Sequence, residues 1–169
     1  MISLCQLNVL SDEEFVSALG GIYEHSRWVA QRVLRQRPFA GLIELKQAMR
    51  RAVDEASHEE KLVLIQAHPD LAGKLARAGT LTEESTREQS GLGLDRLSDA
   101  EYEEFSAHNE SYWEKFGFPF IICARLTTRQ GVLDAFKARM ENSRESELRE
   151  ALEQIHLIAG MRLGDAIHD

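Results

Sequence analysis

The stretch "SDAEYEEFSAHNESYWEK", residues 98–115, contains the pattern that decides the fold. Ser98 is followed three residues later by Glu101, which is the spacing of a capping box: the serine side chain caps the first turn and the glutamate reaches back to it. The same spacing occurs in "SDEE" at 11, "SHEE" at 57 and "TTRQ" at 127. We therefore predict four helices that begin with these motifs, at about 11–19, 58–67, 98–115 and 128–141.

The rest of the chain adds helical signals and one segment of strand character. We predict two further helices at about 25–36 and 41–56, and a long last one at about 145–167. The exception is "FPFIICARL" (118–126), which is short, apolar and β-branched, and could be a strand or a buried extended segment. One strand without a partner cannot form a sheet. The predicted fold is all-α, a single-domain helical bundle of about seven to nine helices over residues 1–169.

Composition excludes several classes of protein. The chain has 169 residues, 43% of them apolar and 28% charged, which argues against disorder. A net charge of −8 without a concentrated basic patch argues against a nucleic-acid partner. No apolar stretch approaches the ~20 residues of a membrane helix, so no membrane association is expected. Cys5 and Cys123 have no metal or redox spacing, and "MISLCQLNVLSDEEF" has no signal peptide, so we expect a reduced cytoplasmic location.

The first break in the helical pattern is at His68, in "LVLIQAHPDLAGK" (62–74), where an apolar run ends in a histidine followed by Pro69. A histidine at a helix end can simply interact favourably with the helix dipole. It can also be an imidazole held in place for proton transfer near neutral pH. The sequence leaves both interpretations open.

The second break is "TEESTREQSG" (82–91), which has no apolar residue. On a helix, Ser85, Glu88 and Gln89 share one face because they stand at i, i+3 and i+4. They could belong to a solvated helix in which Ser85 and Glu88 form a further capping box. Alternatively the polar face lines a cavity, where a hydroxyl, a carboxylate and an amide suit a small ligand rich in hydrogen bonds.

The third break is Arg162, which takes an apolar position on the last predicted helix, four residues after Ile158. An inward guanidinium needs an anionic acceptor, unless the side chain extends outward to solvent. The expected buried stripe of this helix is Leu148, Ala151, Leu152, Ile155, Ile158, Ala159, Arg162 and Ala166. Taken together, the three breaks supply the groups of an acid–base and anion-binding pocket.

Three blocks in this order, "AHPDLAGK", "LTEESTREQSGLGLDRLS" and "NESYWEKFGFPFIICAR", followed by the late arginine, resemble the 2-oxo-4-hydroxy-4-carboxy-5-ureidoimidazoline (OHCU) decarboxylase family. The resemblance covers about residue 8 to the C-terminus. It implies an all-α, homodimeric enzyme of purine catabolism that converts OHCU to (S)-allantoin and carbon dioxide without a cofactor. The sequence departs from the family's pattern only at "QSGLGL", which follows Gln89 and lies beyond the matched motif.

The resemblance also implies site residues. His68 and Glu88 would be catalytic. Substrate would be bound by Pro69, Ser85, Thr86, Arg87, Glu88, Gln89, Phe120, Ile121, Ile122, Cys123, Ala124 and Arg162. No metal site is expected, and no HExxH or paired-cysteine motif occurs. The alternatives are a non-catalytic helical protein of the same fold that binds a small ligand, and a scaffold for protein partners.

Overall fold

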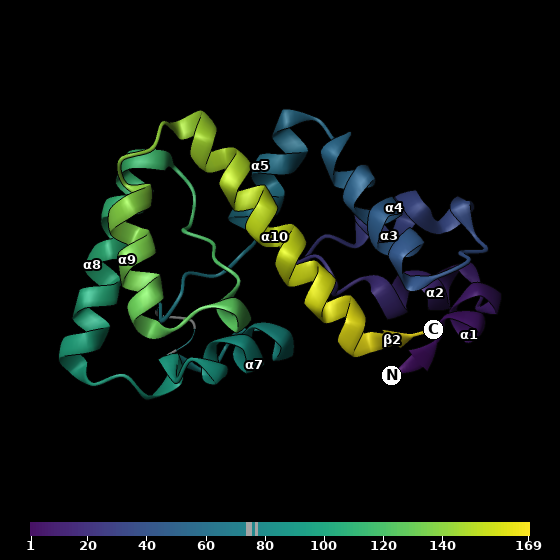
Figure 1. Ribbon diagram of the computed structural model, residues 1–169, viewed down its shortest axis with the longest axis horizontal. Coiled ribbons are helices and arrows are strands. Elements are labelled where there is room, and N and C mark those ends of the chain that lie inside the picture. The colour runs from purple at the N-terminus through teal and green to yellow at the C-terminus, as the bar shows by residue number, and fades with distance from the viewer. Residues whose placement is uncertain (74–75, 77) are drawn as a thin grey trace. The chain divides into compact units, whose positions relative to one another are not determined.

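The computed structural model describes residues 1–73, 76 and 78–169, and these are mainly helical (Figure 1). Nine α-helices lie in this described part, so the predicted all-α class is confirmed. Three 3₁₀ turns and one pair of two-residue strands complete it. The helices are α1 Leu4–Val9, α2 Asp12–Leu19, α3 Arg27–Val33, α4 Leu42–Asp54, α5 His58–Gln66, α7 Glu83–Gly91, α8 Asp99–Phe116, α9 Arg129–Arg139 and α10 Arg144–Ala166; the turns are η1 Leu34–Gln36, η2 Leu94–Arg96 and η3 Ala124–Leu126; the strands are β1 Ile2–Ser3 and β2 Ile167–His168.

Three of the four predicted capping boxes form, at the N-termini of α2, α5 and α8. The prediction for α9 was wrong by one residue, because Thr128 caps this helix and accepts the Gly131 N–H at 3.1 Å. Gln130 does not reach back, since its amide donates to Asp134 at 2.9 Å. The alternative in which Ser85 and Glu88 form a further capping box is also wrong. Thr82 is the N-cap of α7, and its side chain accepts the Ser85 N–H.

The sequence reading missed α1 and the strand pair. Helix α1 begins with a capping box of Ser3 and Gln6, which has the same spacing as the predicted boxes, so it could have been found. The strands β1 and β2 pair in parallel, with Ile2 opposite Ile167. Two-residue strands at opposite ends of a chain leave no periodic signal, so only the tertiary structure places them together.

The chain divides into two compact units: unit 1 comprises residues 1–67 and 156–169, and unit 2 comprises residues 68–155. Each unit is described by itself. Helix α10 contributes its first half to unit 2 and its second half to unit 1. The expected single domain over residues 1–169 stays a prediction.

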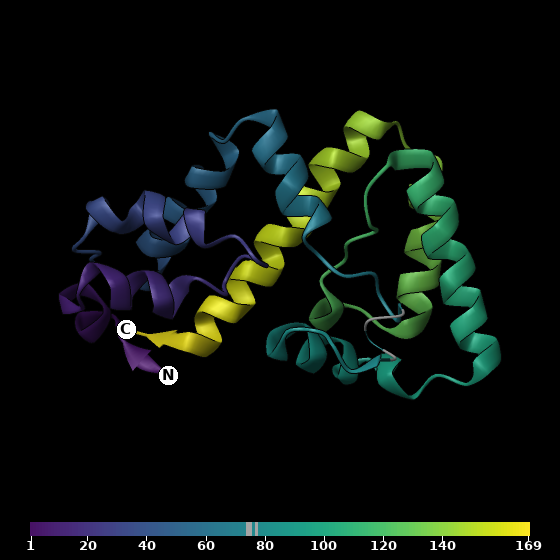
Figure 2. The same ribbon diagram turned by 180° about the vertical axis from the view of Figure 1, so that it is seen from behind.

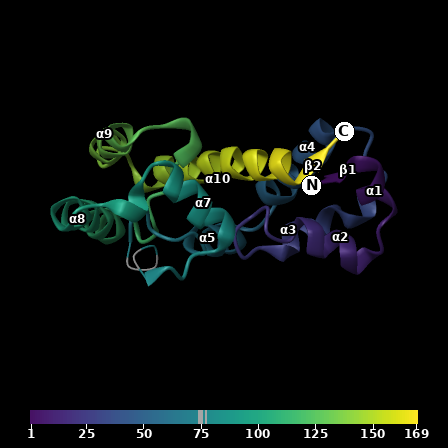
Figure 3. The same ribbon diagram turned by 90° about the horizontal axis from the view of Figure 1, so that it is seen from below.

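Unit 1 has a mainly aliphatic core that includes the aromatic pair Phe15 and Phe39. Helix α3 packs against α2 and α4, and Figure 3 shows α2 and α3 side by side. Phe15 stacks on Phe39 with ring centroids 6.4 Å apart. The fully buried side chains of this core include Leu7, Phe15, Leu19, Val33, Leu45 and Val53.

Unit 2 has an aromatic core between α8 and α9, which pack against each other (Figure 2). Helix α8 ends at Gly117, whose positive φ of 77° lets the chain turn back at little steric cost. The segment 118–123 that follows is mostly buried and forms no strand within the described residues, so the extended alternative was the right one. Two aromatic rings of this segment, Phe118 and Phe120, form the core together with Tyr112 and Phe116 of α8 and Phe136 of α9.

Candidate active site

His68 lies in unit 2, one residue beyond the C-cap of α5. Helix α5 ends at Gln66 and Ala67 is its C-cap, so the imidazole is outside the helix. The side chain is only 7% exposed, and Pro69 follows it with a fixed φ. A histidine beyond the cap is less well placed to interact with the dipole than one in the last turn.

Three side chains hold the segment that follows Pro69. The amide of Gln89 accepts the Ala72 N–H at 2.9 Å, and its Nε2 lies 3.3 Å from the Asp70 carbonyl. Asn109 of α8 donates to the Leu71 carbonyl at 2.8 Å. Trp113 donates to the Asp70 carboxylate at 2.9 Å. Asp70 is two residues from His68, so the Cα atoms of the two residues are at most about 8 Å apart. These hydrogen bonds therefore fix the backbone close to the histidine.

Helix α7 docks through its polar face. Ser85 and Gln89 are 4% and 5% exposed, Glu88 is half-buried, and Thr86 and Arg87 are exposed. The face expected from the i, i+3, i+4 spacing is therefore the inward one, and it packs toward η3. The side chains of Thr86 and Arg87 point away from this face. A helix without apolar residues docks here because its polar atoms find partners inside the unit.

Glu88 lies close enough to Cys123 to influence its ionisation. Burial raises the pKa of the Cys123 thiol, backbone N–H groups of Arg125 and Leu126 oppose the rise, and the Glu88 carboxylate adds to it. Cys123 is 2% exposed and is a free thiol. The Glu88 carboxylate of α7 therefore lies near Cys123 in the 120–124 segment.

A buried ion pair anchors the backbone of residues 120–124. Arg139 of α9 pairs with Glu147 of α10 at 2.8 Å and donates to the Ile121 carbonyl at 2.6 Å. Its guanidinium also lies over the Phe120 ring, 4.3 Å from the centroid. Gln154 of α10 accepts the Cys123 N–H at 2.8 Å. The segment is thus fixed from two helices, which leaves its other backbone groups in defined directions.

Sequence reasoning missed this ion pair and its neighbour Tyr112. The Tyr112 hydroxyl donates to Glu147, and burial, followed by that hydrogen bond, raises the pKa of Tyr112. Glu147 is fully buried and stands four residues before Ala151, on the apolar stripe of α10. The stripe test that singled out Arg162 could therefore have found Glu147 too.

Arg162 lies in unit 1 and is 5% exposed, so the outward orientation is excluded. Its Nη1 atom is 2.6 Å from Oε2 of Glu24 and 3.3 Å from the Gly21 carbonyl. Glu24 is itself 2% exposed. The inward guanidinium of Arg162 therefore has a carboxylate of the protein itself, that of Glu24, as an acceptor. Glu24 lies in the irregular segment before α3, where no periodic pattern marks it.

A hollow of about 460 Å³ borders the held segment in unit 2, and Asp70, Glu110 and Glu114 contribute three carboxylates to its wall. Such a wall repels an anionic substrate, and neither His68 nor Glu88 lines it. Among the residues that the structure covers, no group of three or more histidine, cysteine, aspartate or glutamate side chains is placed to hold a metal ion. Within the same residues, none of the helices has the length and apolar character to cross a membrane.

Comparison with known proteins identifies the family. The family model described as OHCU decarboxylase matches residues 8–164. The chain belongs to the OHCU decarboxylase family. The matched span contains all the candidate site residues from His68 to Arg162; Lys74, which ends the first motif block, lies outside the described residues.

Individual members of the family are similar over nearly the whole chain. The 2-oxo-4-hydroxy-4-carboxy-5-ureidoimidazoline decarboxylase of Haloferax volcanii is 43% identical, over 97% of this chain and 95% of its own. A crystal structure of OHCU decarboxylase in the presence of (S)-allantoin superposes with a TM-score of 0.69 at 25% identity, covering 92% of this chain and 97% of that one. A crystal structure of (S)-allantoin synthase gives 0.78 at 35% identity over 98% of this chain, which spans 54% of that protein.

Proposed function

We propose that this chain converts OHCU to (S)-allantoin and carbon dioxide, the last step from urate to allantoin, as a carboxy-lyase that needs no cofactor. The observation that carries the proposal is the family match over residues 8–164, which includes both His68 and Glu88. The geometry of unit 2 supports it, because the polar face of α7 is bonded to the segment two residues after His68.

The substrate explains why the reaction can proceed with amino-acid side chains alone. OHCU carries its carboxylate and a hydroxyl on one ring carbon, next to a carbon–nitrogen double bond. The electron pair left when carbon dioxide departs can move into that double bond, so the substrate supplies its own electron sink. The protein's task is then to hold the substrate, to handle protons and to choose the face on which the new C–H bond forms.

His68 is the proposed proton donor or shuttle, because an imidazole titrates near neutral pH and such a group typically contributes about 10²–10⁴-fold in rate. Pro69 keeps the imidazole directed. Glu88 is proposed to bond the substrate hydroxyl or the imidazole, and thereby to set the protonation state of His68. A half-buried carboxylate is suited to this, since its charge is less screened than at the surface.

The remaining candidate residues are proposed to bind the substrate. The Oε1 atom of Gln89 accepts the Ala72 N–H. Its Nε2 group has two hydrogens and can also donate to a ring or ureido carbonyl of the substrate. The backbone of Phe120–Ala124 offers further N–H and carbonyl groups, and Arg162 would hold an anionic or carbonyl oxygen. Ser85 faces inward, whereas Thr86 and Arg87 would contribute through the backbone, because their side chains are exposed.

Circular dichroism during urate oxidation tests the activity, because uncatalysed decay of OHCU gives racemic allantoin. Freshly formed OHCU in chelator-treated buffer is expected to give (S)-allantoin and carbon dioxide faster with the protein than without it. Racemic product, or a rate equal to spontaneous decay, would reject the proposal. Saturable allantoin binding without any rate gain would instead favour a non-catalytic ligand-binding protein.

We also propose that the enzyme is a cytoplasmic homodimer organised as one domain. Support comes from the family resemblance and, for the compartment, from two free cysteines, of which Cys5 is exposed. Light scattering coupled to size-exclusion chromatography checks the subunit number. A mass near the 19.2 kDa of one chain would reject the dimer.

A further inference from the structure

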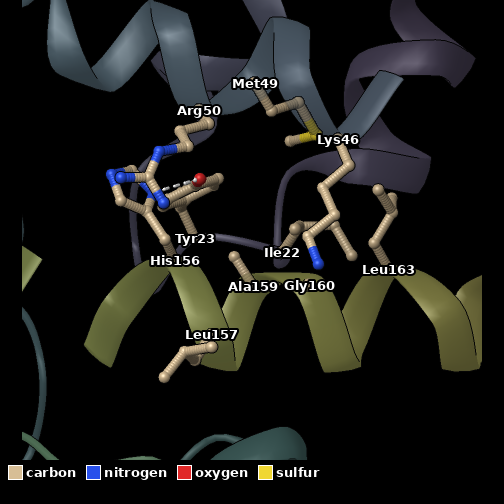
Figure 4. Close-up of a pocket in the computed structure, with 10 residues that line it drawn as sticks. All are labelled: Ile22, Tyr23, Lys46, Met49, Arg50, His156, Leu157, Ala159, Gly160 and Leu163. Atoms are coloured by element: carbon tan, nitrogen blue, oxygen red, sulfur yellow. Dashed lines mark hydrogen bonds between the residues drawn. The ribbon is translucent and has the colours of Figure 1, made fainter. Parts of the chain in front are cut away.

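Unit 1 contains a second cavity that the proposed reaction does not use. It has a volume of about 80 Å³ and lies between α4 and the second half of α10 (Figure 4). A water molecule needs about 10–15 Å³ of such space, so roughly five to eight atoms of that size fit. Its apolar wall is formed by Ile22, Met49, Leu157, Ala159 and Leu163.

One wall of the cavity is polar and is fixed by a chain of hydrogen bonds. The Tyr23 hydroxyl lies 2.9 Å from Nδ1 of His156, and Nε2 of His156 lies 3.2 Å from the Asp54 carboxylate. A neutral imidazole satisfies both contacts when Nε2–H donates to Asp54 and Nδ1 accepts from Tyr23. The other oxygen of Asp54 is 3.4 Å from Nε of Arg50. The wall is therefore preorganised, with a guanidinium at its end.

A second cation lies across the cavity from this wall. Figure 4 shows the Lys46 side chain extending toward Gly160. A Cβ atom at Gly160 would lie 2.6 Å from the Lys46 ammonium nitrogen, so the lysine end occupies space that a side chain at this position would need. Lys46 is exposed, and it precedes Arg50 by four residues, which places both cations on one face of α4.

The charges around the cavity sum to a positive value. Lys46 and Arg50 contribute two positive charges and Asp54 one negative charge, while a neutral His156 adds none. This excess of one is local, because the whole chain carries −8. An apolar floor with one net positive charge at its rim is complementary to a compact monoanion with an apolar body.

We propose that this cavity binds a small aliphatic monocarboxylate, with its carboxylate between Lys46 and Arg50 and its hydrocarbon body against Met49 and Leu163. The site is distinct from the proposed active site. Gly160 and Arg162 are two residues apart on α10, which places them about 200° apart around the helix. Neither Arg162 nor Glu24 lines the cavity.

Amide chemical-shift mapping by NMR on the full ¹⁵N-labelled chain tests the site. The probe is isovalerate, and its matched control is isovaleramide, which has the same shape and no charge; ionic strength is held constant because salt screens the pairing. Saturable shifts at millimolar isovalerate are expected for residues lining the cavity, above all around Lys46 and Gly160. Isovaleramide is expected to cause much smaller shifts.

A charge-removing variant makes the test specific. Lys46→Gln is expected to weaken isovalerate binding about tenfold, equivalent to about 1.4 kcal/mol. Lys137→Gln, at an exposed position of α9 in unit 2, is the matched control and should bind like the parent protein. The proposal is overturned by equal binding of the amide, by unchanged affinity in Lys46→Gln, or by saturable shifts confined to the surroundings of α7 and Arg162.

Discussion

The guanidinium of Arg162 and the carboxylate of Glu24 form a buried ion pair, with Nη1 2.6 Å from Oε2. Both side chains are at most 5% exposed. Removing one partner of such a pair leaves the other charge buried without it, which typically costs about 3–5 kcal/mol. Arg162 thus stabilises unit 1, whatever it does for the substrate.

A double replacement separates the two roles of Arg162. Arg162→Met alone should lower the free energy of unfolding by about 3–5 kcal/mol, because Glu24 loses its guanidinium partner. Glu24→Leu combined with Arg162→Met should regain most of that loss, since apolar residues often replace a buried pair at little cost. Decarboxylase activity should stay low in both variants. Denaturant unfolding and the allantoin assay measure the two quantities, and return of activity together with stability would remove Arg162 from the active site.

His68→Asn is expected to lower the rate of (S)-allantoin formation by about 10²-fold or more, because it removes the proposed proton donor. Asparagine keeps a polar side chain at a buried position, so the melting temperature should change little. The rate is followed by circular dichroism. A variant that kept more than roughly a tenth of the parent rate would rule out a central proton-transfer role of this size.

Glu88→Gln keeps the shape of the side chain and removes its charge. We expect a severe loss of activity and a nearly unchanged melting temperature, because Thr82, and not Ser85 with Glu88, caps α7. Thr82→Ala is the matched control: it should lose about 1 kcal/mol of stability and keep its activity. If Glu88→Gln instead lost stability and remained active, its carboxylate would be structural.

Gln154→Leu tests whether the 120–124 backbone binds substrate. The change removes the acceptor of the Cys123 N–H and leaves this donor unsatisfied, so it should lower stability by about 1–3 kcal/mol. The Michaelis constant for OHCU should rise more than kcat falls, since the segment would bind and not react. Gln130→Leu is the control, because its side-chain amide donates to Asp134 one turn along α9, away from the 120–124 segment. Equal kinetic constants in the two variants would contradict the proposed role.

Three capping boxes predict how stability depends on pH. The hydroxyl and backbone N–H of Ser11 lower the pKa of Glu14, and the backbone N–H and hydroxyl of Ser57 and Ser98 do the same for Glu60 and Glu101. A carboxyl whose pKa is lower in the folded state stabilises it fully above the unfolded pKa, about 4.3. The contribution is lost as the pH falls through the lowered folded values.

The triple variant Glu14→Gln, Glu60→Gln and Glu101→Gln should therefore show a flatter decline of the unfolding free energy between about pH 5 and pH 3. Glutamine can still bond the capping serine, so stability near pH 7 changes less than the slope does. Replacing three exposed glutamates that no capping serine contacts, Glu13, Glu59 and Glu103, controls for total charge. The same flattening in that control would refute the link to the caps.

Local rules in the sequence were sufficient for the starts of α2, α5 and α8. A serine three residues before a glutamate places two groups that satisfy the first turn of a helix, and this needs no knowledge of the rest of the chain. Ser98 and Glu101 are the clearest case. At α9 two adjacent threonines, Thr127 and Thr128, could each cap the helix, and the structure has Thr128 as the N-cap while Gln130 bonds Asp134.

The sequence by itself determined the all-α class, which residues of α7 share its polar face, and the position of Arg162 on an otherwise apolar stripe, because each follows from spacing along a single helix. Only the tertiary structure decided the partners: Glu24 for Arg162, Glu147 and the Ile121 carbonyl for Arg139, and Ala72 for Gln89. These pairs join residues that are 8 to 138 positions apart in the chain. A buried charge or amide requires a partner, but its spacing in the sequence does not say which group far along the chain will meet it.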